Sequence, residues 1–129
     1  MINGLWGKKI GMTQMFSRDN KVVPVTAIDV GSWYVTQVKT EDRDGYSALQ
    51  LGCVKDRYRD ASFSMDWIKK PKRYFSALRE VRISPSHEFE VGQEVVVNGV
   101  LEEGEAVDVF GTTTGKGFQG VIKRHGFAG

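Results

Sequence analysis

The sequence has one cysteine, three prolines and no long apolar run among its 129 residues. Because Cys53 has no second cysteine to pair with, a disulfide bond within the chain is excluded, and a small buried thiol in a reducing compartment is its expected state. The opening residues MINGLWGKK contain too few apolar side chains for a secretion signal. No later segment approaches the roughly 20 apolar residues of a membrane span. The sequence therefore indicates an intracellular protein without a membrane partner.

Histidine, a common catalytic and metal-binding side chain, occurs only twice. Neither His87 nor His125 has a cysteine or carboxylate at the spacing of a metal site, and no nucleophile lies in a recognisable catalytic motif. His87 is expected at the surface, and His125 is expected to pack or stack. The sequence thus predicts no catalytic residue, no metal ion, no cofactor and no small-molecule substrate.

One glycine-rich segment, residues 111–116 (GTTTGK), partly matches the phosphate-binding P-loop of nucleotide hydrolases. A P-loop has four residues between its first glycine and the Gly-Lys pair, and a serine or threonine after the lysine. Here only three threonines separate Gly111 from Gly115, and Gly117 takes the place of the hydroxyl that would bind magnesium. A nucleotide-binding enzyme is therefore kept only as an alternative, beside a free-standing regulatory β-barrel.

What the sequence does contain is the composition of one globular domain over residues 1–129, with 40% hydrophobic and 26% charged residues. The apolar patterns predict a mostly β fold, with strands over residues 21–30, 34–39, 46–54, 78–83, 94–97 and 106–110. The first of these strands is apolar on both alternating faces, which favours burial in a barrel or sandwich, while Pro24 indicates an edge or a bulge. Asp44 and Gly45 suit a tight turn.

Residues 55–77 are polar, basic and aromatic without a sustained period, and we expect them to form a long insertion loop with room for one helical turn. The chain ends on residues 111–129, which contain no acid. In this segment Phe118, Val121, Ile122 and His125 are spaced as one face of a helix, so a short C-terminal helix is predicted. The whole basic, glycine-rich segment is expected to begin an extension from the domain.

Charge is separated along the chain, although the net charge is only +2. Residues 68–82 hold six basic residues and one acid, whereas residues 83–108 hold seven acids and no lysine or arginine. Such a separation predicts one face for an anionic partner and an opposite acidic face.

Within residues 67–75 (WIKKPKRYF), cations are interleaved with aromatic rings. Cations neutralise phosphates and exposed rings stack on bases, so this segment favours a nucleic acid as the anionic partner. The aromatic side chains could equally cover the β domain, an explanation that does not account for four clustered cations. Both interpretations of Trp67, Tyr74 and Phe75 stay open at this point.

Four segments carry a specific pattern: GKKIGMTQMF (7–16), DGYSALQLG (44–52), FEVGQEV (89–95) and TTGKGFQGVIKRHGFAG (113–129). Together they resemble the bacterial form of the large-subunit ribosomal protein L3 family. The resemblance is collinear over essentially the whole chain, and its first and last segments are the most specific.

The resemblance implies a β-barrel of the type shared with translation factors. It also implies binding to large-subunit ribosomal RNA beside neighbouring ribosomal proteins, a role in subunit assembly, and an extension toward the peptidyl transferase region. Family members continue beyond the equivalent of Gly129 into the rest of that extension and into strands that complete the barrel. The chain is therefore expected to be the N-terminal portion of such a protein, with an incomplete barrel. The expected location is a cytoplasmic ribosome, with an organellar ribosome as the other option.

The resemblance also implies which residues contact RNA. Lys8 and Lys9 match the basic pair of the opening motif, where Gly7 and Gly11 would let the strand lie close to an RNA backbone. The cations of residues 69–73 fall in a region that the family varies and are assigned from their clustering. The three threonines would add hydroxyl contacts to phosphate or ribose. The full predicted set is Lys8, Lys9, Lys69, Lys70, Lys72, Arg73, Thr112, Thr113, Thr114, Lys116, Lys123, Arg124 and His125.

Overall fold

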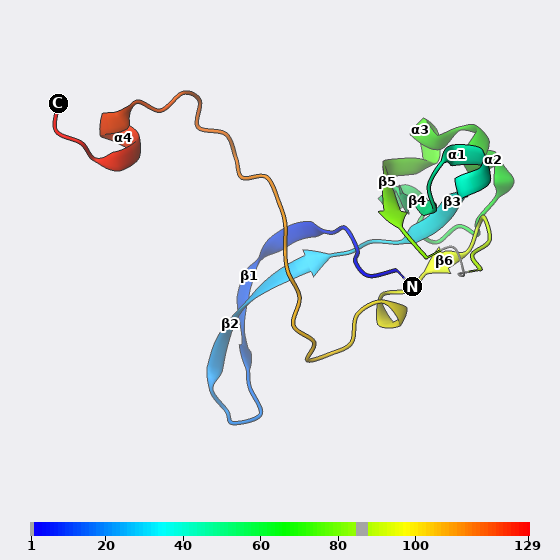
Figure 1. Ribbon diagram of the computed structural model, residues 1–129. Coiled ribbons are helices and arrows are strands. Elements are labelled where there is room, and N and C mark those ends of the chain that lie inside the picture. The colour runs from blue at the N-terminus through cyan, green and yellow to red at the C-terminus, as the bar shows by residue number, and fades with distance from the viewer. Residues whose placement is uncertain (1, 85–87) are drawn as a thin grey trace.

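The structure is a computed structural model that describes residues 2–84 and 88–129. Its strands form two antiparallel sheets, a two-stranded hairpin and a four-stranded sheet with the order β5-β4-β3-β6 (Figure 1). The strands are β1 (Lys8–Phe16), β2 (Val22–Asp29), β3 (Trp33–Lys39), β4 (Ala48–Val54), β5 (Phe75–Arg82) and β6 (Glu94–Val95). The helices are α1 (Glu41–Asp44), η1 (Asp56–Tyr58), α2 (Met65–Lys69), α3 (Pro71–Tyr74), η2 (Val97–Gly99) and α4 (Val121–His125).

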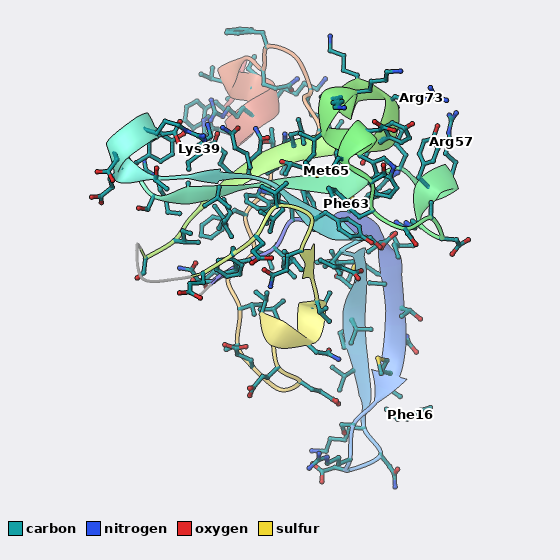
Figure 2. The ribbon with its side chains drawn as sticks, turned by 90° about the vertical axis from the view of Figure 1, so that its right-hand side faces the viewer. Phe16, Lys39, Arg57, Phe63, Met65 and Arg73 are labelled. Atoms are coloured by element: carbon teal, nitrogen blue, oxygen red, sulfur yellow. The ribbon has the colours of Figure 1, made fainter. Side chains whose placement is uncertain are left out.

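The hairpin pairs β1 with β2 from Lys8 opposite Asp29 to Phe16 opposite Val22, with a bulge after Lys9. Pro24 is tolerated because β2 is an edge strand, whose outer side needs no ladder hydrogen bond. The prediction that this strand is buried is wrong, since most of its residues are exposed. In the described part of the chain no second layer covers the hairpin, and β1 exposes Phe16 to 78% at the end far from the four-stranded sheet (Figure 2).

The four-stranded sheet carries the core on both of its faces. Ile2, Trp33, Val35, Leu49 and Leu51 form one buried cluster. A second cluster of Val54, Trp67 and Phe75 lies under the helices α2 and α3. Because successive side chains of a strand point to opposite faces, β4 can supply both clusters, and its central place between β3 and β5 leaves it the most buried strand.

The buried polar group of this sheet has its hydrogen bonds. Thr36 lies at a bulge in the β3–β4 pairing, between Val35 and Gln37. Its hydroxyl contacts both the backbone carbonyl of Gln50 at 3.1 Å and the side-chain oxygen of Gln50 at 2.9 Å. The bulge therefore leaves the buried Thr36 hydroxyl with hydrogen-bond partners.

The predicted insertion loop at residues 55–77 contains more regular structure than one helical turn. It forms η1, α2 and α3, and β5 already begins at Phe75. Ser64 caps α2 by accepting a hydrogen bond from the backbone N–H of Asp66 at 3.3 Å, and Pro71 begins α3 at a position where a proline costs nothing. The segment is ordered because it carries Trp67, which packs over the sheet and is only 4% exposed.

The other predicted elements agree with the structure to different degrees. Strands are confirmed near residues 21–30, 34–39, 46–54, 78–83 and 94–97, and the short C-terminal helix is confirmed as α4. The predicted turn at Asp44 and Gly45 ends the single-turn helix α1, where Gly45 has a φ of 79°. The strand predicted at residues 106–110 is wrong, because that segment pairs with no strand among the described residues and Val109 is exposed.

The described strands do not close into a barrel. Residues 105–120 form neither helix nor strand, and Figure 1 shows that they lead to α4, which lies away from both sheets. The molecule thus consists of a packed β body, an exposed hairpin and an extended segment that ends in the basic tail, residues 111–129.

Candidate nucleic-acid interface

Four of the predicted cations lie together on α2, α3 and the junction between them. This helical basic surface consists of Lys69, Lys70, Lys72 and Arg73, all exposed. Lys69 has an acidic neighbour, Asp66, whose carboxylate is 4.0 Å away. Since both side chains are largely in water, that ion pair contributes little and leaves the lysine able to bind another anion.

The aromatic residues of the same segment point inward, which decides the interpretation that the sequence left open. Trp67 stacks on Tyr74 with ring centroids 5.6 Å apart and meets Phe75 edge-on at 6.1 Å. Trp67 and Phe75 are buried, and Tyr74 is half-buried. The rings therefore anchor the helices to the sheet, while the cations between them face solvent.

Arg73 is held in place by two tyrosines. Its guanidinium lies 5.5 Å from the ring centre of Tyr74, and its hydrogen bond to Tyr58 lowers the pKa of the Tyr58 phenol. Arg57 approaches the ring of Tyr58 at 6.0 Å. Figure 2 shows Arg57 and Arg73 projecting on the same side of the molecule, so two planar cations supported by aromatic rings are presented together.

At the start of β1, Lys8 and Lys9 are exposed as the sequence predicts. The close approach that Gly7 permits is to the chain's own hairpin, because a Cβ atom there would lie 2.4 Å from the Cγ2 atom of Ile28. Gly11 has open space around it. Gly7 is thus required by the packing of β1 against β2, independently of any RNA.

A cleft lies between the base of the hairpin and the four-stranded sheet, with a volume of about 750 Å³. Besides Lys8, it is lined by four cations that were not in the predicted set: Lys55, Arg57, Arg59 and Arg79. The sequence holds a signal for three of them, since in residues 55–59 (KDRYR) a cation follows β4 at every second position. Their meeting with β1 depends on tertiary folding and could not be predicted from spacing.

Asp29 organises one wall of this cleft. Its carboxylate accepts hydrogen bonds from the backbone N–H of Gly31 at 2.9 Å and from Arg59 at 3.1 Å, and these bonds lower the pKa of Asp29. Arg59 also meets Asp56 at 3.0 Å. Gly31 has a φ of 63°, which a side chain would strain, and a Cβ atom there would lie 3.0 Å from the Cys53 sulfur.

The cleft also holds the only cysteine of the sequence. The predicted buried thiol is confirmed only in part, because Cys53 packs against the core cluster and yet lines the cleft as a half-buried residue.

The predicted tail residues Thr112, Thr113, Thr114, Lys116, Lys123, Arg124 and His125 are all exposed. The ring centre of His125 lies 5.6 Å from that of Phe127 with the rings tilted by 31°, so the predicted packing of this histidine is limited to one tilted contact at the surface. His87 lies outside the described residues. Phe118, predicted on the apolar face of the helix, precedes α4 and is 98% exposed.

The tail does not have the geometry of a P-loop. In the described structure no strand leads into Gly111, and α4 begins only at Val121, five residues after Lys116. Nothing around Lys116 therefore forms the strand-loop-helix that cradles nucleotide phosphates.

The structure places the predicted cations in separate groups. The helical basic surface adjoins the cleft, because the Lys55 ammonium donates to the Lys72 backbone carbonyl at 2.7 Å. The tail cations lie apart from both, at the far end of the extended segment (Figure 1). Within residues 2–84 and 88–129, no three His, Cys, Asp or Glu side chains could hold a metal ion together. No helix in those residues is long and apolar enough to cross a membrane.

The fold and the exposed cations define a small β-rich protein with a basic surface. A family model described as "Ribosomal protein L3" matches residues 77–129. A protein of Planobispora rosea named "Large ribosomal subunit protein uL3" is 46% identical over 133 aligned residues, which cover 99% of this chain and 92% of that protein. Proteins of the same name are 47% identical in Syntrophus aciditrophicus and 46% identical in Syntrophotalea carbinolica.

The chain belongs to the ribosomal protein L3 family. It spans 57% of the Syntrophus protein and 62% of the Syntrophotalea protein, in each case with at least 95% of its own length aligned. These relatives carry the name of a protein of the large ribosomal subunit and not of an enzyme.

Proposed function

We propose that this chain is a structural constituent of the large ribosomal subunit, where it binds ribosomal RNA beside neighbouring ribosomal proteins and helps the subunit to assemble near the peptidyl transferase region. Its mechanism is electrostatic: lysines and arginines offset the repulsion between phosphates where RNA segments converge. It acts in the ribosome of the cytoplasm, and it carries out no chemical step itself.

The acid-free exposed tail is the observation that carries this proposal. Residues 111–129 contain Lys116, Lys123 and Arg124 and no aspartate or glutamate that could neutralise them. An extended segment that is rich in glycine and cations gains order when it lies against a polyanion. The three threonine hydroxyls would contact phosphate or ribose 2′-hydroxyl groups along the same path.

The two sheets are, in this proposal, parts of a translation-protein-type barrel. The hairpin exposes apolar side chains, Ile10 at 71% among them, that further strands of a longer chain would cover. The extra length of the relatives leaves room for such strands.

The direct test is to replace Lys123 and Arg124 with alanine in the full chain and measure binding to a large-subunit ribosomal RNA fragment. Two lost phosphate contacts should make the dependence of log affinity on log salt less steep by about one to two units. The matched control removes two exposed cations at the hairpin tip, Arg18→Ala with Lys21→Ala, and should leave the slope nearly unchanged. Equal slopes for wild type and the tail variant would contradict the proposal.

A further inference from the structure

The cleft at the base of the hairpin has more cationic side chains than its acids can neutralise. Its two acids, Asp29 and Asp56, both pair with Arg59. The other four lining cations, Lys8, Lys55, Arg57 and Arg79, make no ion pair with a carboxylate in the described part of the chain. The cleft therefore keeps an uncompensated positive charge.

These four cations belong to residues from three parts of the fold that line the same cleft. Lys8 begins β1, and Arg79 lies on β5, opposite Leu51 of β4. Lys55 and Arg57 lie at and just after the end of β4, and the Lys55 ammonium is fixed by its bond to the Lys72 carbonyl. A ligand in the cleft would meet positive charge from several directions, an arrangement that concentrates anions.

The cleft also has an apolar wall that a flat group could contact. Trp6 and Trp33 line it with ring centroids 5.7 Å apart. Trp33 is buried, whereas Trp6 is half-buried and keeps part of its ring accessible. The volume of about 750 Å³ lies within the range of small-molecule sites, roughly 300–1,000 Å³.

We propose that this cleft binds a nucleotide of a single-stranded RNA segment, with the phosphates at Lys8, Arg57 and Arg79 and the base or ribose against Trp6. The inference rests on the proposed ribosomal RNA binding and deepens it, because it adds a second RNA-binding site, formed by the folded body, to the one proposed for the tail. A single-stranded RNA fits this cleft better than an acidic peptide does. Each nucleotide carries both a negatively charged phosphate and a flat base, whereas an acidic side chain carries the charge alone.

Cys53 provides a probe of occupancy, since its thiol is the only one in the sequence and lines this cleft. The full chain would be treated with iodoacetamide while an oligouridylate of about ten nucleotides is titrated in. Because only the unoccupied cleft reacts, alkylation should slow by about tenfold when the oligouridylate concentration is ten times its dissociation constant.

A double substitution tests the cations of the cleft. Arg57→Ala with Arg79→Ala should make the dependence of log affinity on log salt less steep by about 1.4 units, whereas the hairpin-tip control should leave it unchanged.

The possible results separate this inference from the function on which it rests. RNA binding that leaves the alkylation rate of Cys53 unchanged, or an Arg57→Ala, Arg79→Ala variant with the same affinity and salt slope as the control, overturns the cleft site while the tail site stands. Protection by oligoglutamate in place of RNA also overturns it, in favour of an acidic protein partner. No RNA binding by the wild type removes both. Arg57→Lys with Arg79→Lys keeps both positive charges and should therefore keep most of the salt dependence of RNA binding. This variant distinguishes an effect of lost charge from an effect of misfolding.

Discussion

Gly52 and Phe75 show how tightly single residues are constrained in this small core. Gly52 lies in the central strand β4, and a Cβ atom built on it would stand 2.7 Å from the Cδ1 atom of the Phe75 ring. Phe75 is buried and meets Trp67 edge-on, so its ring has little freedom to move away. The position therefore admits no side chain, for reasons of packing and not of backbone conformation.

We expect Gly52→Ala to lower the free energy of unfolding by about 1–3 kcal/mol, the usual cost of overpacking a core. Urea unfolding followed by tryptophan fluorescence measures this. Gly99→Ala is the matched control, because a Cβ atom there has nothing within 4 Å. A Gly52→Ala protein as stable as the control would show that the Phe75 ring moves freely.

At the scale of elements, a polar cluster stabilises one end of the strands β3, β4 and β5. Lys39 at the end of β3 forms an ion pair with Glu80 of β5, and the Tyr46 hydroxyl donates to the same carboxylate at 2.8 Å. These bonds lower the pKa of Glu80 and raise the pKa of Lys39. The Arg82 guanidinium lies 4.4 Å from the centre of the Tyr46 ring. The cluster connects β3 to β5 across β4.

The pKa shifts give Glu80→Gln a defined pH dependence. A lowered pKa of Glu80 means that its contribution is complete above the unfolded value, 4.5, and disappears as the pH falls through the folded value. The raised pKa of Lys39 means that its contribution disappears only in strong alkali. Wild type should therefore unfold at a higher urea concentration than Glu80→Gln at pH 7, and the two midpoints should converge in strong acid. A constant difference from pH 7 to pH 2 would contradict this.

How far these elements could be predicted depends on whether their signal is local. Residues 34–39 (YVTQVK) and 46–54 (YSALQLGCV) are rich in apolar, aromatic and β-branched side chains, and their strands form close to where this composition predicts. Residues 106–110 (AVDVF) are similarly apolar, but no described strand pairs with them. A strand needs a partner, and the sequence pattern does not report whether one is present. The sequence predicts too little helix in residues 55–77, because these short helices depend on the packing of Trp67 against Tyr34 and Tyr74 and have no clear helical pattern of apolar residues.

The same distinction applies to the candidate site. Cations that cluster in the sequence, such as Lys69 and Lys72, could be included in the predicted set directly, and the structure exposes them on one surface. Arg79 and Lys8 are far apart in the chain and meet only because the hairpin base lies against the β4–β5 side of the sheet. The role of Trp67 could not be decided beforehand, because a ring in a basic segment has the same sequence signature whether it faces RNA or the core.

At the scale of the whole molecule, the basic groups lie on adjacent parts of the packed body and extend beyond it along the tail. The cleft and the helical basic surface are adjacent on the body, and the tail carries further cations away from it (Figure 1). A protein of this shape can contact RNA segments that are distant from one another, which is the physical requirement for holding a folded RNA together.

Sedimentation with large ribosomal subunits tests this account most directly. A tagged copy of the chain, expressed in a bacterium that carries a close relative, should migrate with the large subunit and stay there through a high-salt wash. A copy that lacks the tail cations Lys116, Lys123 and Arg124 should be released at lower salt. Recovery of the unaltered chain only in the soluble fraction, at every salt concentration, would contradict the account.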